Sequence, residues 1–386
     1  MKKSENESSL KRRKLLIVMP SLVGGGAERV LINLLKLIDI NKYEVDLFVV
    51  EHKGELWPQV PKEVNKYLIF PSVILSKLSS YLYRRFGVNL LIKLHGKKIK
   101  GNYDVGISFL DSIHTEFLFH NDAKINKRVT VIHSSYKSYS NKSRFIKGKY
   151  KKVIKKRLKQ LDTIISVSHE GLLEFKEMLG EYKDMRVIYN PINARDIIKK
   201  SSSNIPIKVE GEILNFIAIG SLIPVKGFDM LISAAKILKD KGFKFRINIL
   251  GEGFLRKELE SQIQLSELND CVFLKGFIPN PYPWLLHSDV LVMSSESEGL
   301  PTVLCEALIL GKPTITPNVP GCREVVDYGN SGLMFDRNAS QLASAMQVFI
   351  EDKSKMAYYA EKSKERSIIF NDKSAVEQYM QVFDQD

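Results

Sequence analysis

The sequence has few cysteines and no long apolar run, and each absence excludes a class of protein. Its three cysteines, Cys271, Cys305 and Cys322, have the spacing of neither metal ligands nor a disulfide framework. We expect buried free thiols in a reducing compartment. No apolar run reaches membrane-spanning length. The charged residues of 1–14 leave no room for the apolar region of a signal peptide, and we expect a basic, flexible N-terminal segment of a cytoplasmic protein.

Metal-binding patterns are missing as well. The sequence contains no HExxH motif and no cluster of cysteine and histidine. It also lacks any recognised nucleic-acid-binding motif. We therefore expect no metal, no cofactor and no nucleic-acid partner.

Positive charge is abundant but confined to one half of the chain. The net charge is +14 over 386 residues. Residues 1–200 hold 39 Lys/Arg and 20 Asp/Glu, whereas residues 201–386 hold 19 and 24. The basic excess in the first half predicts a negatively charged partner there.

Short apolar runs alternate with amphipathic helical runs along most of the chain, which predicts parallel sheets covered by helices. The length suits two domains. We expect a domain at 15–195, a linker at 196–212 where serine, asparagine and proline break the pattern, and a domain at 213–368. A last helix, within 369–386, is expected to pack back on the first domain. This is an α/β fold of two doubly wound, Rossmann-like domains that face a central cleft, with the ligand at the carboxyl ends of the strands.

The expected elements are as follows. Strands are predicted at 15–20, 45–50, 104–108, 128–133, 163–167, 186–189, 213–219, 245–250, 271–275, 289–294 and 313–316. Helices are predicted at 27–38, 74–86, 141–160, 169–180, 227–240, 254–266, 301–310, 339–351, 354–367 and 372–384.

The most informative motif places two carboxylates eight positions apart. Glu298 precedes a Gly-Leu-Pro turn, and Glu306 lies inside the helical run that follows. Free N–H groups and the dipole at the start of this helix favour an anion. At about 1.5 Å of rise per residue the carboxylates should be roughly 10 Å apart. That separation is too large for an acid/base pair on one bond, but it suits a ligand with a sugar at each end and phosphates between.

A glycine-containing loop follows the first strand of each predicted domain. In the first, Gly24, Gly25 and Gly26 precede the first helix, and in the second Gly220-Ser221 is followed by Lys226. Glycines let a ligand approach the backbone, and a helix start attracts phosphate. A tight strand-to-helix turn explains the first loop equally well, and a lone lysine is more often a solvated surface residue.

Two further polar residues stand where strands should end in the cleft. His133 follows the apolar run 129–132, and Asp111 follows 107–110. A lone histidine is usually structural, and the position of His133 at a strand end adds weight to a functional role. Among the other histidines, we expect His169 to help begin a helix.

The segment 141–160 carries ten Lys/Arg and no acidic residue. Its apolar residues recur at helical spacing, which predicts a basic amphipathic helix whose apolar side packs on the core. Each Lys/Arg near an anionic bilayer contributes about 1 kcal/mol of binding. We therefore expect membrane contact through five lysines: Lys149, Lys151, Lys152, Lys155 and Lys156. A second basic patch within 84–100 would add to it.

Together these features resemble a family 4 glycosyltransferase of the GT-B fold, over nearly the whole chain. The resemblance is carried by the Gly24–Arg29 loop, Ser166-Val-Ser168, Tyr189-Asn190-Pro, Lys226-Gly227, Gly251-Glu-Gly253 and the Glu298–Glu306 element. The Gly-Gly-Ala-Glu-Arg motif, Phe-Leu-Asp111 and His133 resemble bacterial enzymes that extend lipid-linked oligosaccharides or surface polysaccharides.

The resemblance implies a role for each site residue. Glu306 would hold the ribose of a nucleotide sugar, Glu298 the donor hexose, and Lys226 the diphosphate, while His133 would lie near the reacting carbon. The remaining donor-binding residues are Gly25, Gly26, Ser221, Gly251, Phe277, Ile278, Gly299 and Leu300. Ser221 departs from the family, which commonly has arginine there; Lys226 and helix dipoles would suffice, or another basic residue such as Arg256 would substitute.

The implied activity is retaining transfer of a hexose or N-acetylhexosamine, from a UDP-linked donor in preference to a GDP-linked one, to a lipid-linked or polysaccharide acceptor. The enzyme would be metal-independent and peripheral on the inner face of the plasma membrane. Alternatives are a sugar-nucleotide epimerase of the same fold, a phosphorylase or synthase of soluble disaccharides, and a non-catalytic membrane-associated subunit of a glycan assembly complex.

Overall fold

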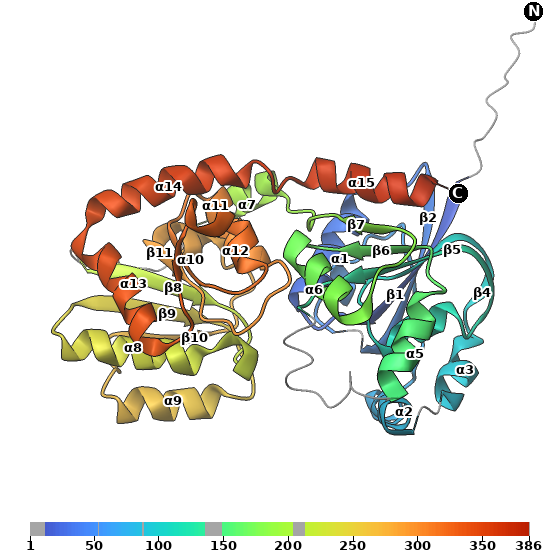
Figure 1. The fold of residues 1–386 in the computed structure, drawn as a ribbon, viewed down its shortest axis with the longest axis horizontal. Helices are drawn as coiled ribbons and strands as arrows, with labels where there is room; N and C mark the ends of the chain where they lie inside the picture. The colour runs from blue at the N-terminus through green and yellow to red at the C-terminus, as the bar shows by residue number, and fades with distance from the viewer. Residues whose placement is uncertain (1–11, 53, 87–88, 136–148, 204–212, 386) are drawn as a thin grey trace, which may run out of the picture.

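The computed structural model describes residues 12–52, 54–86, 89–135, 149–203 and 213–385, and these form two parallel sheets with helices on both faces (Figure 1). The first sheet has the strand order β3-β2-β1-β4-β5-β6-β7 and the second β10-β9-β8-β11-β12-β13. Most of the predicted terminal segment 1–14, and residues 204–212 of the predicted linker, lie outside the described residues.

Buried apolar runs form the central strands of the first sheet, as expected for parallel strands covered on both faces. In β1 all five residues from Leu15 to Met19 are buried. The strands are β1 (Arg13–Ser21), β2 (Tyr43–His52), β3 (Asn65–Leu68), β4 (Lys100–Ser108), β5 (Asp122–Ile132), β6 (Thr163–Ser166) and β7 (Met185–Val187). The helices of this domain are α1 (Gly26–Leu37), α2 (Val73–Phe86), α3 (Leu90–Gly96), α5 (Lys149–Leu158) and α6 (His169–Leu179), with the 3₁₀ segments η1 (Trp57–Gln59) and η2 (Ile113–Leu118). Helix α7 (Ala194–Ser201) follows this domain and packs against the other one.

The second domain repeats this plan with a smaller sheet. Its strands are β8 (Leu214–Ile219), β9 (Phe245–Leu250), β10 (Val272–Gly276), β11 (Val290–Val292), β12 (Thr314–Pro317) and β13 (Leu333–Phe335). Its helices are α8 (Phe228–Asp240), α9 (Arg256–Leu265), α10 (Tyr282–His287), α11 (Thr302–Ile309), α12 (Cys322–Val325), α13 (Ala339–Glu351) and α14 (Lys353–Ser367), with the 3₁₀ segments η4 (Pro224–Lys226) and η5 (Asp327–Gly329).

Each predicted strand, and every predicted helix except that at 141–160, lies within a few residues of an observed element. Within 141–160 the structure describes α5, and residues 141–148 lie outside the described part. Six short elements, each of eight residues or fewer, were not predicted from the sequence: β3, α3, α7, α10, α12 and β13. In addition, α7 occupies the first part of the segment predicted as a linker.

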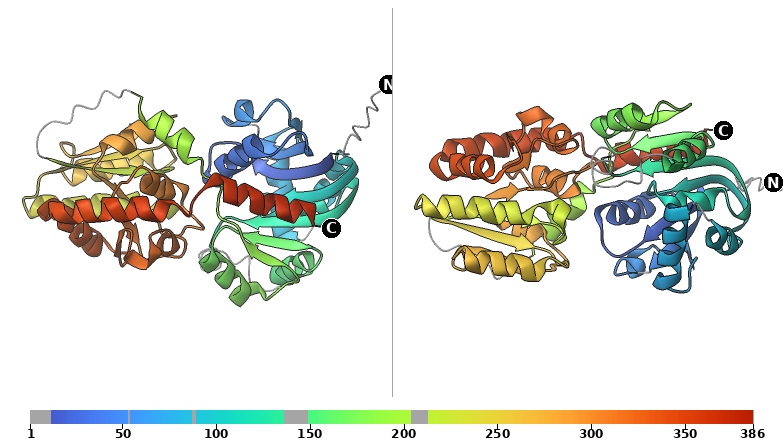
Figure 2. Two further views of the ribbon diagram at one scale, coloured as in Figure 1. Left: turned by 90° about the horizontal axis from the view of Figure 1, so that it is seen from above. Right: turned by 60° about the horizontal axis from the view of Figure 1, so that its bottom comes forward.

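The last two helices connect the domains. Figures 1 and 2 show α14 along the C-terminal domain and α15 (Asp372–Asp384) along the N-terminal one. Tyr379 and Phe383 of α15 are fully buried, and Asp384 accepts a 2.7 Å hydrogen bond from the hydroxyl of Tyr43. The C-terminal helix thus packs on the domain that begins the chain.

A buried carboxylate of the C-terminal domain connects it to the N-terminal domain by hydrogen bonds. Glu324 of α12 accepts hydrogen bonds from the main-chain N–H of His169 at 2.9 Å and of Glu170 at 3.0 Å, at the start of α6. It also accepts one from the hydroxyl of Tyr189 at 2.8 Å. A carboxylate at a helix N-terminus is stabilised by the free N–H groups and the dipole. His169 therefore does stand at a helix start, where Ser168 is the capping side chain.

Candidate functional site

A cleft of about 680 Å³ lies between the domains at the carboxyl ends of their strands. The N-terminal domain contributes the glycine loop before α1 and His133 after β5. The C-terminal domain contributes the loop after β8, the residues that follow β9 and β10, and the start of α11. All twelve residues that the sequence assigned to catalysis or donor binding line this one cleft.

Glu306 lies at the α11 end of the cleft, beside an arginine and a tyrosine. The hydroxyl of Tyr282 donates to its Oε1 at 3.2 Å. Burial raises the pKa of Glu306, and the hydrogen bond from Tyr282 and the charge of Arg29 oppose that rise. The carboxylate therefore has two neighbours that favour its charged form and a position where a ligand hydroxyl can reach it.

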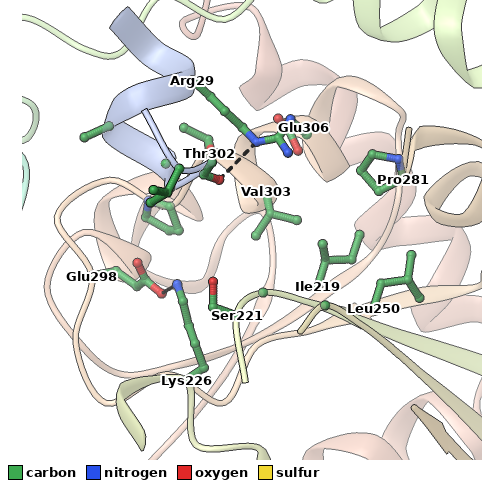
Figure 3. A pocket seen from close by; sticks show the side chains of 18 of the residues that line it. Arg29, Ile219, Ser221, Lys226, Leu250, Pro281, Glu298, Thr302, Val303 and Glu306 are labelled. Atoms are coloured by element: carbon green, nitrogen blue, oxygen red, sulfur yellow. Dashed lines mark hydrogen bonds and ion pairs between the residues drawn. The ribbon is translucent and has the colours of Figure 1, made fainter. Parts of the chain in front are cut away.

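Arg29 comes from the opposite domain and was not among the predicted site residues. Its guanidinium extends from α1 toward Glu306 (Figure 3) and makes only a long hydrogen bond, 3.4 Å from Nε to the carbonyl of Gly24. Within the part of the chain that the structure describes, Arg29 makes no ion pair. An arginine with free donors in a cleft is suited to bind a phosphate or carboxylate.

Glu28 explains why Arg29 points into the cleft. The buried Glu28 carboxylate accepts the N–H groups of Gly24 at 2.6 Å and Gly25 at 2.5 Å, together with the hydroxyl of Ser21. These bonds fix the loop at the start of α1. Glycine and arginine of the Gly-Gly-Ala-Glu-Arg motif thus line the cleft, while its glutamate has a structural role.

Lys226 and Glu298 form an ion pair at the other end of the cleft. Lys226 Nζ lies 2.7 Å from Glu298 Oε1, and both side chains are largely buried. Both residues were predicted from the sequence, but with roles at different parts of the ligand. Figure 3 shows the pair on the side of the cleft away from Arg29, with Ser221 beside it. The two cations of the cleft are therefore separated, and one of them already has an acidic partner.

Arg256, considered as a substitute for the missing arginine at position 221, is held elsewhere. It lies on α9, 2.6 Å from Glu252 Oε1 and 2.8 Å from Glu260 Oε1. Among the described residues, the basic side chains that line the cleft are Arg29, Lys226 and His133. If a second cation assists at this site, the geometry favours Arg29.

The start of α11 presents main-chain donors to the cleft. Pro301 caps the helix without a side-chain hydrogen bond, which leaves the first-turn N–H groups of Thr302 and Val303 for a ligand. Gly299 brings this turn against the other domain, because a Cβ there would lie only 2.2 Å from the carbonyl oxygen of His133. Gly299 therefore allows the two walls of the cleft to meet.

His133 is a neutral imidazole in this setting. Burial lowers its pKa to about 3, so it carries no charge at neutral pH. Its ring packs 5.1 Å from that of Phe109, and among the described atoms its Nε2 has no hydrogen-bond partner. A buried ring nitrogen without a partner, on a residue that lines a cleft, has an unused capacity for a hydrogen bond.

Two turns, one after β9 and one after β10, complete the wall of the cleft that the C-terminal domain forms. Gly251 has φ of 145°, and a Cβ there would lie 1.9 Å from the carbonyl oxygen of Gly220, so only glycine fits. Phe277 is 46% exposed although it is aromatic, and it lines the cleft together with Ile278. Ser221 is exposed and lines the same cleft with its hydroxyl.

Asp111 and the basic helix belong to a different part of the first domain. Asp111 pairs with Arg157 of α5 at 2.6 Å, and both side chains are buried. Arg157, which the sequence grouped with surface charges, is thus structural.

Lys151 and Lys155 are partly exposed and Lys156 is exposed, as a surface role requires. The side chains of Lys149 and Lys152 lie outside the described part of the structure. No described helix is both long and apolar enough to cross a bilayer.

Known proteins resemble this chain in sequence and in architecture. Residues 24–196 match the protein family "Glycosyltransferase Family 4", and residues 202–366 match the family "Glycosyl transferases group 1". The N-acetylgalactosamine-N,N'-diacetylbacillosaminyl-diphospho-undecaprenol 4-alpha-N-acetylgalactosaminyltransferase of Campylobacter jejuni is 26% identical, over 93% of this chain and 96% of that protein.

Solved structures agree on the fold. Staphylococcus aureus TarM, in complex with Fondaparinux, alpha-GlcNAc-glycerol and UDP, matches with a TM-score of 0.74 at 14% identity, over 97% of this chain and 100% of that one. Anabaena HepE with UDP and glucose matches with a TM-score of 0.71 at 19% identity, over 96% and 99%. The predicted two-domain fold is confirmed, and the chain belongs to glycosyltransferase family 4, with the GT-B fold.

Proposed function

We propose that this glycosyltransferase moves a hexose or N-acetylhexosamine from a UDP-linked donor to a lipid-linked or polysaccharide acceptor, with retention of anomeric configuration. The observation that carries the proposal is the order of groups along the cleft. Glu306, the free N–H groups of α11 and the Lys226–Glu298 pair offer in turn an acceptor for ribose hydroxyls, donors for a diphosphate and a carboxylate for a sugar.

The donor would lie along the C-terminal wall. Glu306 accepts from the ribose, while Phe277 and Ile278 contact the base. The diphosphate meets the N–H groups at Gly299, Leu300 and the α11 start. These donors and a cation stabilise the negative charge that grows on the leaving phosphate.

The sugar would lie where the two domains meet. Glu298 holds its hydroxyls, and Gly25 and Gly26 leave space for it because neither bears a side chain. His133, uncharged and with a free ring nitrogen, contacts the sugar near the reacting carbon. Ser221 and Gly251 bound the same space from the C-terminal domain.

The reaction would pass through an oxocarbenium-like state, as in glycosidases. The bond from the anomeric carbon to the phosphate oxygen breaks, the acceptor oxygen attacks the same face, and the departing phosphate takes the acceptor proton. No protein nucleophile or metal takes part in this scheme. The cleft supplies charge stabilisation and orientation instead.

The acceptor and its membrane would lie on the N-terminal domain. The relative from Campylobacter jejuni carries diphospho-undecaprenol in its name, which supports a lipid-linked acceptor. The basic excess of the first half of the chain and the exposed lysines of α5 favour an anionic surface. The enzyme would thus work at the inner face of the plasma membrane.

A transfer assay tests the proposal. The purified full chain is incubated with UDP- and GDP-linked sugars and a membrane extract as acceptor source, and nucleoside diphosphate release and the anomeric configuration of the product are followed. A glycosylated product of unchanged configuration from a UDP-sugar supports the proposal. Conversion of the free donor to another nucleotide sugar would instead identify an epimerase, and absence of donor turnover in a folded protein would favour a non-catalytic subunit.

A further inference from the structure

Helix α2 presents several large apolar side chains to solvent, while two of its serines face the protein. Ser76, Ser79 and Tyr83 face the domain and are buried. On the opposite side Ile74, at 81% exposure, and Leu78 form an exposed stripe at helical spacing. A surface helix of a globular domain normally has the reverse arrangement. The outer side of α2 therefore requires a covering partner or an apolar medium.

The exposed stripe continues along α3. Phe86 closes α2, and Leu90 and Leu94, four positions apart, lie on the outer side of α3. Six large apolar side chains, each between 47% and 81% exposed, make up what we call the α2–α3 surface: Ile74, Leu78, Tyr81, Phe86, Leu90 and Leu94. In Figure 1 α2 lies at the bottom of the N-terminal domain, below α5, and α3 lies on the side away from the C-terminal domain. A patch of this kind on a soluble domain marks an interaction site.

The segment that carries this surface is basic in sequence. Residues 71–100 contain seven Lys/Arg and no Asp/Glu. Lys77 and Arg85 of α2 and Lys93 of α3 are exposed beside the apolar stripe, as is Lys97 directly after it. Apolar and aromatic side chains flanked by lysine and arginine are typical of helices that lie in the interface of a bilayer. The charge is complementary to anionic headgroups.

The α2–α3 surface is tied to the basic helix α5. The hydroxyl of Tyr83 in α2 donates to Glu116 Oε1 at 2.7 Å, and Arg157 Nη1 of α5 lies 3.9 Å from the same oxygen. Both helices are therefore fixed to one buried carboxylate of η2. The exposed lysines of α5 and the apolar α2–α3 surface therefore belong to neighbouring elements of one domain.

We propose that the α2–α3 surface inserts into the interfacial region of an anionic membrane, with α2 lying in the membrane plane. The proposal rests on the proposed work at a lipid-borne acceptor and adds an apolar anchor to the charge contacts of α5. Membrane binding through charge alone is abolished by high salt. Binding that also inserts apolar side chains persists in part at high salt. The two contributions are therefore separable by experiment.

The test is flotation of the full chain with vesicles of phosphatidylethanolamine and phosphatidylglycerol, at low and high salt. The Leu78→Ser/Leu94→Ser variant should lose at least about tenfold in vesicle affinity and all binding at high salt. Leu265→Ser is the matched control, because Leu265 is an exposed leucine on α9 of the other domain. It should bind as the unmodified chain does. Circular dichroism and nucleotide-sugar binding show that each variant is folded.

A second measurement does not depend on removing apolar residues. Tyr81→Trp should show a blue-shifted fluorescence on vesicle addition, and Leu265→Trp should not. Unchanged flotation of the double serine variant, or no shift from Tyr81→Trp, would overturn the proposal. So would an unmodified chain that is dimeric without lipid and becomes monomeric in the serine variant, since a second copy would then cover the surface. Donor binding is measured separately, so a failed anchor and a failed glycosyltransferase site give different results.

Discussion

Replacing Lys226 by methionine should lower turnover strongly, because it changes two charges at once. The substitution removes a cation from the cleft and leaves the Glu298 carboxylate, 2.7 Å away, without its partner. The donor diphosphate carries negative charge, which increases as the glycosidic bond breaks. Lys226→Met therefore weakens attraction for the leaving group and adds repulsion from Glu298.

The magnitude follows from the geometry. Unit charges about 4 Å apart, at an effective dielectric constant of about 20, interact by about 4 kcal/mol. Removal of one preorganised donor to a developing oxyanion costs about 2.7–4 kcal/mol. We expect kcat to fall by about 100- to 1000-fold. Lys226→Met/Glu298→Gln should lose less than the sum of the single variants, with a coupling of about 1–3 kcal/mol, because the unpaired carboxylate is gone.

The assay is the release of nucleoside diphosphate at saturating donor, together with a single-turnover measurement that separates binding from chemistry. Lys226→Arg is the control, since it keeps the charge. A Lys226→Met enzyme whose kcat lies within about threefold of the unmodified value would refute the reasoning. Strict additivity in the double variant would show that the ion pair does not couple the two roles.

Three further results are expected. Because burial raises the pKa of Glu306, donor affinity should fall on acidification at a higher pH than an exposed glutamate would dictate, and Glu306→Gln should remove this dependence in calorimetric titrations. The pKa of His133 is about 3 in the folded protein and about 6.5 in the unfolded chain, so the free energy of unfolding falls as the pH drops from about 6.5 to about 3. In urea titrations over this range, His133→Asn should reduce the slope of the unfolding free energy against pH by up to about 1.4 kcal/mol per pH unit. Arg29→Met should raise the donor Kd by about 10- to 100-fold, because hydrogen bonds to charged groups contribute about 1.5–3 kcal/mol, and an unchanged Kd would exclude Arg29 from the donor site.

Much of the fold could be predicted because its central strands are continuous apolar runs. The run in β1 has no other reasonable place than a sheet covered on both faces. Edge strand β3 was missed because its four residues alternate between exposed and half-buried and include lysine and asparagine. The three residues of β13 are too few for any period to show.

The sequence predicted which residues line the cleft better than it predicted which of them contact one another. Glycine spacing and the two glutamates located the cleft, but the Lys226–Glu298 contact joins residues 72 positions apart and depends on how the loop after β8 meets that before α11. Arg29 was visible in the motif, yet its direction depends on the Glu28 bonds to the loop. Arg157 looked like a surface charge because sequence composition does not show which side of α5 faces Asp111.

The outer side of α2 shows the same limit. Its apolar residues recur at helical spacing, a pattern that normally indicates a buried side. Only the structure shows that Ser76 and Tyr83 face the domain instead. A period therefore identifies the apolar side of a helix, but not what that side contacts.

The most direct test of the central claim is calorimetric titration of a panel of UDP- and GDP-sugars into the unmodified chain and its Glu306→Ala variant. Glu361→Ala, on the exposed side of α14, serves as the control. We expect one UDP-sugar to bind the unmodified and control proteins, and Glu306→Ala to weaken this binding by tenfold or more, about 1.4 kcal/mol. Equal affinity in all three folded proteins would contradict the assignment of this cleft as the donor site.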